Sequence, residues 1–90
     1  MICLKIIKGI DLQVNLCDAE LIGKSVNGSK ISENFYGVKA SQEEIIQALK
    51  EATLINALGS KAVALVKKIK GELETINLNG IPHVQFFLMP

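Results

Sequence analysis

The stretch that decides the fold is SQEEIIQALKEATLINALGSKAVALVKKIKG, residues 41–71. Ser41 and Glu44 form a capping box, in which each side chain accepts a hydrogen bond from the other's backbone at the start of a helix. Apolar residues then recur at helical spacing: Ile45, Ala48, Leu49 and Ala52. The first half of this stretch therefore predicts an amphipathic helix.

The second half of the stretch predicts a second helix, which Thr53 can cap and Gly71 can end. Its apolar stripe would consist of Ile55, Leu58, Ala62, Leu65, Val66 and Ile69. Gly59-Ser60 lies inside this stripe, so Ser60 could instead cap a shorter helix. We favour one helix in which Gly59 allows close packing.

Both flanks of this helical region predict β-hairpins. Residues 2–7 and 12–17 each alternate with a period of two, around a turn at residues 8–11. One register places Cys3 opposite Cys17, a second pairs Leu4 with Val14, and the sequence does not decide between them. The other hairpin has Asn79-Gly80 at its turn, between residues 75–78 and 84–88.

The segment between the first hairpin and the helices is mixed. Asp18 can cap a short helical turn over residues 18–23, which Gly23 can end. Asn27-Gly28 then indicates a small hairpin or an irregular crossing within residues 24–38. The whole order predicts one α+β domain over residues 1–90, with a mainly antiparallel sheet from the N- and C-terminal hairpins and two central helices packed on one face.

The composition limits the function classes. The chain has a net charge of +1 and no arginine, the residue best suited to base-specific contacts with nucleic acid, although its lysines can still neutralise phosphate. No apolar run is long enough to span a membrane and no secretory signal is evident, so we expect a cytoplasmic protein. The two cysteines are too few for a disulfide scaffold or a four-cysteine zinc site.

His83 is the first candidate for a functional residue. It is the chain's one histidine, and Pro82 before it fixes the backbone at the entrance to a strand. Cys17 and Asp18 are the second candidates, because a cysteine at a helix entrance can be nucleophilic and a nearby aspartate can orient a histidine. A metal site built from Cys3, Cys17 and His83 would lack a further ligand, so we expect no metal and no cofactor.

Four segments carry a resemblance to a known family: CDAELIGK at residues 17–24, FYG at 35–37, ATLINALGSKAV at 52–63 and GIPHVQ at 80–85. Their order and spacing resemble the archaeal family called domain of unknown function 424. Val38 stands where that family has a second glycine after its aromatic pair. The resemblance implies a small archaeal cytoplasmic α+β protein, and it implies no particular activity.

The breadth of that family among archaea implies a housekeeping role near translation or RNA. From this resemblance we expect a binding module linked to RNA or the translation machinery, with RNA or a ribosome-associated protein as its partner. The expected binding residues are His83, Pro82, Tyr36, Asn56 and Lys24. The alternative is a small enzyme or ligand-binding protein that uses Cys17, Asp18 and His83. A homodimer formed through an exposed strand edge or an apolar patch is a third possibility.

Overall fold

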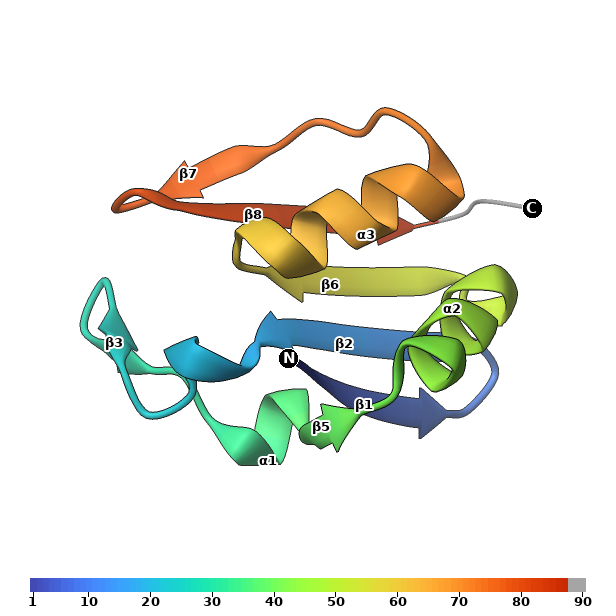
Figure 1. The fold of residues 1–90 in the computed structure, drawn as a ribbon, viewed down its shortest axis with the longest axis horizontal. Helices are drawn as coiled ribbons and strands as arrows, with labels where there is room; N and C mark the ends of the chain where they lie inside the picture. The colour runs from blue at the N-terminus through green and yellow to red at the C-terminus, as the bar shows by residue number, and fades with distance from the viewer. Residues whose placement is uncertain (88–90) are drawn as a thin grey trace.

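A computed structural model describes residues 1–87 as an α+β fold built on a mixed six-stranded sheet (Figure 1). The elements in chain order are β1 (Ile2–Lys8), β2 (Leu12–Asp18), the 3-10 turn η1 (Ala19–Leu21), β3 (Ser25–Val26), β4 (Ser29–Lys30), α1 (Glu33–Tyr36), β5 (Val38–Ala40), α2 (Gln42–Glu51), β6 (Leu54–Leu58), α3 (Ser60–Lys70), β7 (Ile76–Leu78) and β8 (Ile81–Phe87). Within residues 1–87, no helix has the length and apolar character needed to cross a membrane.

The strand order in the sheet is β5-β1-β2-β6-β8-β7. β1 and β2 pair antiparallel in the register that places Cys3 opposite Cys17. β7 and β8 also pair antiparallel, around the turn at Asn79-Gly80. Leu88, the last residue of the expected final strand, lies outside the described residues.

The centre of the sheet differs from the sequence prediction. Residues 54–58, expected to form the first part of a second helix, are the strand β6, which pairs parallel to β2 and antiparallel to β8. A strand buried on both faces carries a nearly continuous apolar run, and the four apolar residues of Leu-Ile-Asn-Ala-Leu fit a helical pattern equally well. The prediction of a single helix from Thr53 is therefore wrong, and α3 begins only at Ser60.

Thr53 has a different role from the expected helix cap. Its hydroxyl oxygen accepts a hydrogen bond from the backbone N–H of Leu12 at 3.1 Å, and its own N–H donates to the Leu12 carbonyl at 2.9 Å. Thr53 thus fastens the start of β6 to the start of β2. The capping box that begins α2 is present as the sequence predicts, with Ser41 Oγ accepting from the Glu44 N–H at 3.1 Å.

Two apolar clusters lie on opposite faces of the sheet, because successive strand residues point to opposite faces. The larger cluster joins α2 and α3 to the strands and includes Leu16, Leu49, Ile55, Val66 and Val84. The smaller cluster joins Cys17 and Leu58 to the segment that contains β3, β4 and α1, and includes Val26, Ile31 and Tyr36. The second face is therefore covered at one end by a short irregular segment and not by a long helix.

Candidate functional site

A hollow of about 370 Å³ lies between the β3–β4 hairpin, α1 and the strand ends that carry His83. Its walls include Lys30, Phe35, Tyr36, Leu58, Leu78 and His83. We call it the hairpin hollow. Tyr36 and His83, two of the residues expected to bind, both line it although they are 47 positions apart in the chain.

His83 lies on β8 between Leu58 of β6 and Ile76 of β7. The ring is half-buried in the wall of the hollow, and burial lowers its pKa below the usual value for histidine. A lowered pKa favours the neutral imidazole near pH 7, which has one hydrogen-bond donor and one acceptor as well as a flat face. The position of His83 therefore suits hydrogen bonding or stacking with a ligand better than attraction of an anion.

Phe35 and Tyr36 form an edge-to-face aromatic pair, with ring centroids 4.7 Å apart and planes at 82°. Tyr36 is buried, and burial raises its pKa to about 12, so the phenol keeps its proton at physiological pH. Phe35 is 44% exposed although it belongs to the wall of the hollow. The pair thus has one ring that anchors α1 and one ring that is accessible to a ligand.

A relay of amide groups holds the backbone at Phe35 against the sheet. Asn56 on β6 donates from Nδ2 to Asn15 Oδ1 at 3.1 Å, and Asn15 Nδ2 donates to the Phe35 carbonyl at 2.9 Å. Asn56 was expected on a helix and among the binding residues, but the structure places it on a strand and outside the walls of the hollow. Its contribution to the hollow is indirect, through the position of α1.

One hydrogen bond joins the two hairpin turns at the rim of the hollow. Asn79 Nδ2 donates to Asn27 Oδ1 at 2.6 Å, and both residues have positive φ, 53° and 51° respectively. Asparagine tolerates this left-handed conformation better than most residues, which explains its place before glycine in each turn. Because Asn27 also lines the hollow, this contact fixes the spacing of the two hairpins around it.

The exposed side chain of Lys30 brings a positive charge to the wall of the hollow. Lys24 is exposed beside this region, and its carbonyl accepts the N–H of the wall residue Ile31 at 2.7 Å. Pro82 lies outside the walls, where its carbonyl accepts the Gly59 N–H at 2.9 Å. Of the five expected binding residues, His83 and Tyr36 line the hollow, and Lys24, Asn56 and Pro82 do not.

Cys17 is fully buried in the smaller apolar cluster. Burial, followed by the charge of Asp18, raises the pKa of this thiol to about 12, and Sγ donates a hydrogen bond to the Asp18 carbonyl at 3.3 Å. Leu58 of the intervening strand separates Cys17 from His83 across the sheet. A thiol in this setting stays protonated, which is the opposite of what a nucleophilic cysteine requires.

Asp18 caps α3, and not the turn that follows it in the chain. Its carboxylate accepts the N–H of Lys61 at 3.1 Å and the N–H of Ala62 at 2.7 Å, and it makes no side-chain cap to η1. Gly59 permits this approach, because a Cβ there would lie 2.4 Å from Asp18 Cγ. The structure therefore does not bring Cys17, Asp18 and His83 together as the enzyme hypothesis requires.

Lys30 and Asn27 line the hollow but are not among the residues expected from the sequence to bind. Both belong to the β3–β4 hairpin, whose turn was predicted from Asn27-Gly28 but whose position over the sheet was not. The signal in the sequence was the pair of Asn-Gly turns, at residues 27–28 and 79–80. Nothing in either turn alone indicates that the two meet.

The comparisons with known proteins agree with this fold and add no activity. A crystal structure of an uncharacterized conserved protein from Methanopyrus kandleri is similar, with a TM-score of 0.80 and 30% sequence identity, over 99% of this chain and 92% of that one. No curated protein matches the chain. The family model described as "Protein of unknown function (DUF424)" matches residues 10–89. The chain therefore belongs to the DUF424 family.

Proposed function

We propose that this chain is a cytoplasmic binding module for single-stranded RNA, and that the hairpin hollow receives an unpaired base. The observation that carries the proposal is the convergence of an accessible aromatic ring, a half-buried neutral imidazole and an exposed lysine in one hollow. These groups come from α1, β8 and β4, so the fold as a whole creates the site.

Stacking would supply the attraction to the base. Single-stranded RNA is recognised through unstacked bases that lie against aromatic or histidine rings, and each stacked base contributes roughly 1–3 kcal/mol. Phe35 offers such a ring at 44% exposure, and His83 can add a hydrogen bond to a base edge through its neutral imidazole. Asn27, Ser29 and Ser32 supply further polar groups in the walls.

Lysine would supply the contact with phosphate. Lys24 and Lys30 are both exposed near the hollow, and the chain contains no arginine for bidentate recognition of a guanine. Two neutralised phosphates correspond to a slope of about −1.4 for log affinity against log salt with single-stranded RNA. A roughly fourfold rise in salt should then weaken binding about sevenfold, with little dependence on sequence.

The proposal is tested by fluorescence anisotropy with short labelled oligouridine and with a mixed-sequence single strand. Phe35→Ala should weaken binding at least about fivefold through lost stacking. Lys30→Glu should weaken binding and reduce the salt slope by about 0.7. Thermal melting of each variant shows whether the fold is retained.

Matched controls come from the opposite end of the molecule. Phe87→Ala removes a ring of similar exposure, 47%, and Lys8→Glu makes the same charge change on an exposed residue of β1. Both controls should bind RNA as the unmodified protein does. Equal losses in Lys8→Glu and Lys30→Glu would indicate non-specific attraction, and unchanged binding by Phe35→Ala would refute the proposed base site.

A further inference from the structure

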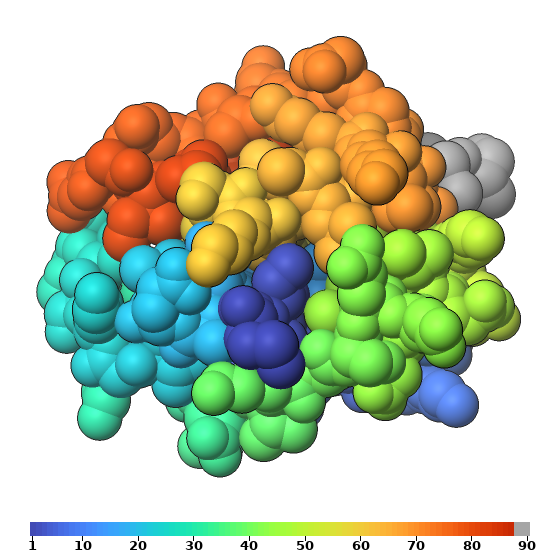
Figure 2. Space-filling model, viewed as in Figure 1, coloured from blue at the N-terminus to red at the C-terminus, as the bar shows by residue number. Residues whose placement is uncertain are grey.

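A second cavity, of about 480 Å³, lies on the face of the sheet that carries the long helices. α3 supplies one wall, α2 and the end of β5 supply the other, and the first residues of the chain lie between them (Figure 2). We call it the α2–α3 groove. It is separate from the hairpin hollow, whose wall residues Leu58 and His83 point to the opposite face of the sheet.

The floor of the α2–α3 groove is apolar. It includes Met1, Ile2, Ala40, Ile45, Ala64 and Leu65. Met1 is 66% exposed, and a methionine at the surface adapts its shape to a bound partner. Met1 and Ala64 are the exposed apolar residues of this floor, whereas Ile45 and Leu65 are buried beneath them. An apolar group of a ligand would therefore contact Met1 and Ala64.

The cationic residues of the groove are arranged in a regular way on α3. Lys61, Ala64, Leu65 and Lys68 line the groove, and their spacing of three, four and seven positions places them on one face of the helix. The backbone positions of the two lysines are about 10.5 Å apart along the helix axis, at 1.5 Å per residue. The groove therefore has a positive charge at each end of an apolar patch.

Lys61 and Lys68 remain able to bind an acidic partner, because, within residues 1–87, no nearby acid holds either of them tightly. The groove-lining residues include no aspartate or glutamate. The Glu20 carboxylate on η1 lies 3.5 Å from Lys61 Nζ, but both side chains are more than half exposed, at 54% for Glu20 and 59% for Lys61. Such a surface ion pair contributes little and exchanges readily with another acid. Glu44 is held in the capping box with Ser41.

We propose that the α2–α3 groove binds an acidic amphipathic helix of a partner protein, with two acidic residues seven positions apart and apolar residues between them. Two helical turns span the distance between Lys61 and Lys68, so the acids would meet both lysines while the apolar residues cover Met1 and Ala64. A fatty acid has one carboxylate, which would leave the second lysine unmatched.

The test uses a fluorescently labelled alanine-based helical peptide that carries Glu-x-x-Leu-Leu-x-x-Glu, and a matched peptide with lysine at both glutamate positions. The glutamate peptide should bind saturably and the lysine peptide should not. Lys61→Glu with Lys68→Glu should weaken binding of the glutamate peptide about tenfold or more and should allow the lysine peptide to bind. Lys68→Glu alone should give a smaller loss, and it leaves the Lys61–Glu20 contact intact.

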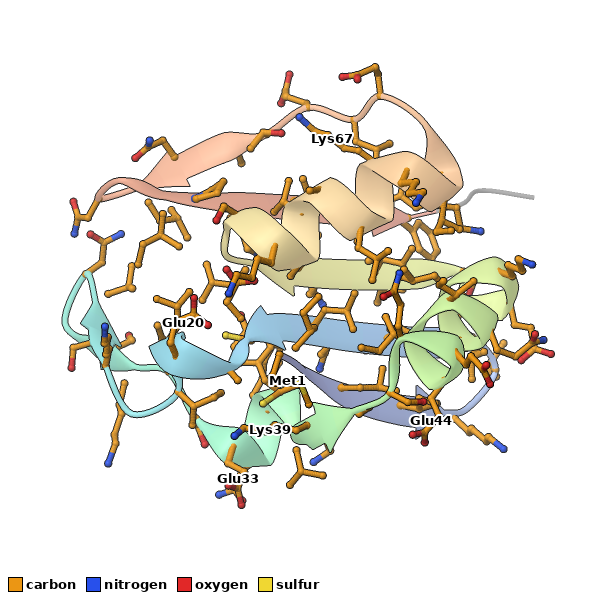
Figure 3. All side chains as sticks on the ribbon, viewed as in Figure 1. Met1, Glu20, Glu33, Lys39, Glu44 and Lys67 are labelled. Atoms are coloured by element: carbon orange, nitrogen blue, oxygen red, sulfur yellow. The ribbon has the colours of Figure 1, made fainter. Side chains whose placement is uncertain are left out.

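The control is Lys67→Glu with Lys70→Glu, which makes the same charge change on the same helix outside the groove. Figure 3 shows Lys67 on the side of α3 away from Met1. Equal losses in the two double variants, or failure of the reversed charges to accept the lysine peptide, would overturn the proposal. RNA binding should stay unchanged in Lys68→Glu, so a failure here is distinguishable from a failure of the hairpin hollow.

Discussion

Removal of the Asp18 carboxylate tests the long-range cap on α3. Asp18→Ala deprives the N–H groups of Lys61 and Ala62 of their acceptor, and the Ala62 contact is buried. Loss of a helix cap costs about 0.5–2 kcal/mol, and a buried donor left without a partner costs about 1–3 kcal/mol. We therefore expect a loss of roughly 2–4 kcal/mol in the free energy of unfolding. The whole free energy of unfolding expected for a domain of 90 residues is roughly 5–13 kcal/mol, so this loss is a large share of it.

The assay is urea unfolding at neutral pH, followed by far-ultraviolet circular dichroism. Asp18→Asn should lose less than Asp18→Ala, because its carbonyl oxygen still accepts one of the two N–H groups. Asp11→Ala is the matched control, since Asp11 is exposed in the first turn and should change stability by less than about 0.5 kcal/mol. An Asp18→Ala loss no larger than that of the control would refute the capping role.

Three further predictions concern Gly59, Cys17 and His83. Gly59→Ala should destabilise the protein by more than Asp18→Ala, because its φ is 106° and the new Cβ would lie 2.4 Å from Asp18 Cγ; the double variant should lose less than the sum of the two losses, as unfolding in urea would show. The Cys17 thiol, with a pKa of about 12, should react with iodoacetamide near pH 8 only as the protein unfolds, and fast labelling followed by mass spectrometry would contradict its burial. Because burial lowers the pKa of His83, the unfolded chain binds the proton more readily, so stability should fall as pH drops through the unfolded value near 6.5. His83→Gln should reduce this dependence, and equal unfolding free energies for the unmodified protein at pH 7.5 and pH 5.5 would contradict it.

Much of the fold follows from local patterns in the sequence. The alternation in residues 2–7 and 12–17, the two Asn-Gly turns and the Ser41–Glu44 capping box each match the structure at their own positions. These signals are local, so a single sequence contains them. The strand β6 could not be recognised in the same way, because Leu-Ile-Asn-Ala-Leu fits a helix and a buried strand equally well. Residues 54–58 form a strand because they pair with β2 and β8, and both of these strands are distant in the chain.

Some residues of the candidate site could likewise be recognised from the sequence, and others only from the structure. His83 and Tyr36 stand out in the sequence because histidine and tyrosine each occur once, and both line the hairpin hollow. Lys30 did not stand out among ten lysines, and only the position of the β3–β4 hairpin over the sheet distinguishes it. Asp18 was read as the cap of the nearest turn, but its hydrogen bonds are made 43 and 44 residues further along.

The long-range cap on α3 makes this helix dependent on the rest of the molecule. The acceptor for the Lys61 and Ala62 N–H groups comes from the end of β2, so these two donors are satisfied only while Asp18 lies beside the start of α3. A peptide of residues 60–70 would fray at its start, and in the intact chain the helix and the parallel pair should open together as one cooperative unit. Anything that binds along α3 would thereby tighten the middle of the sheet as well, through a carboxylate that it never touches.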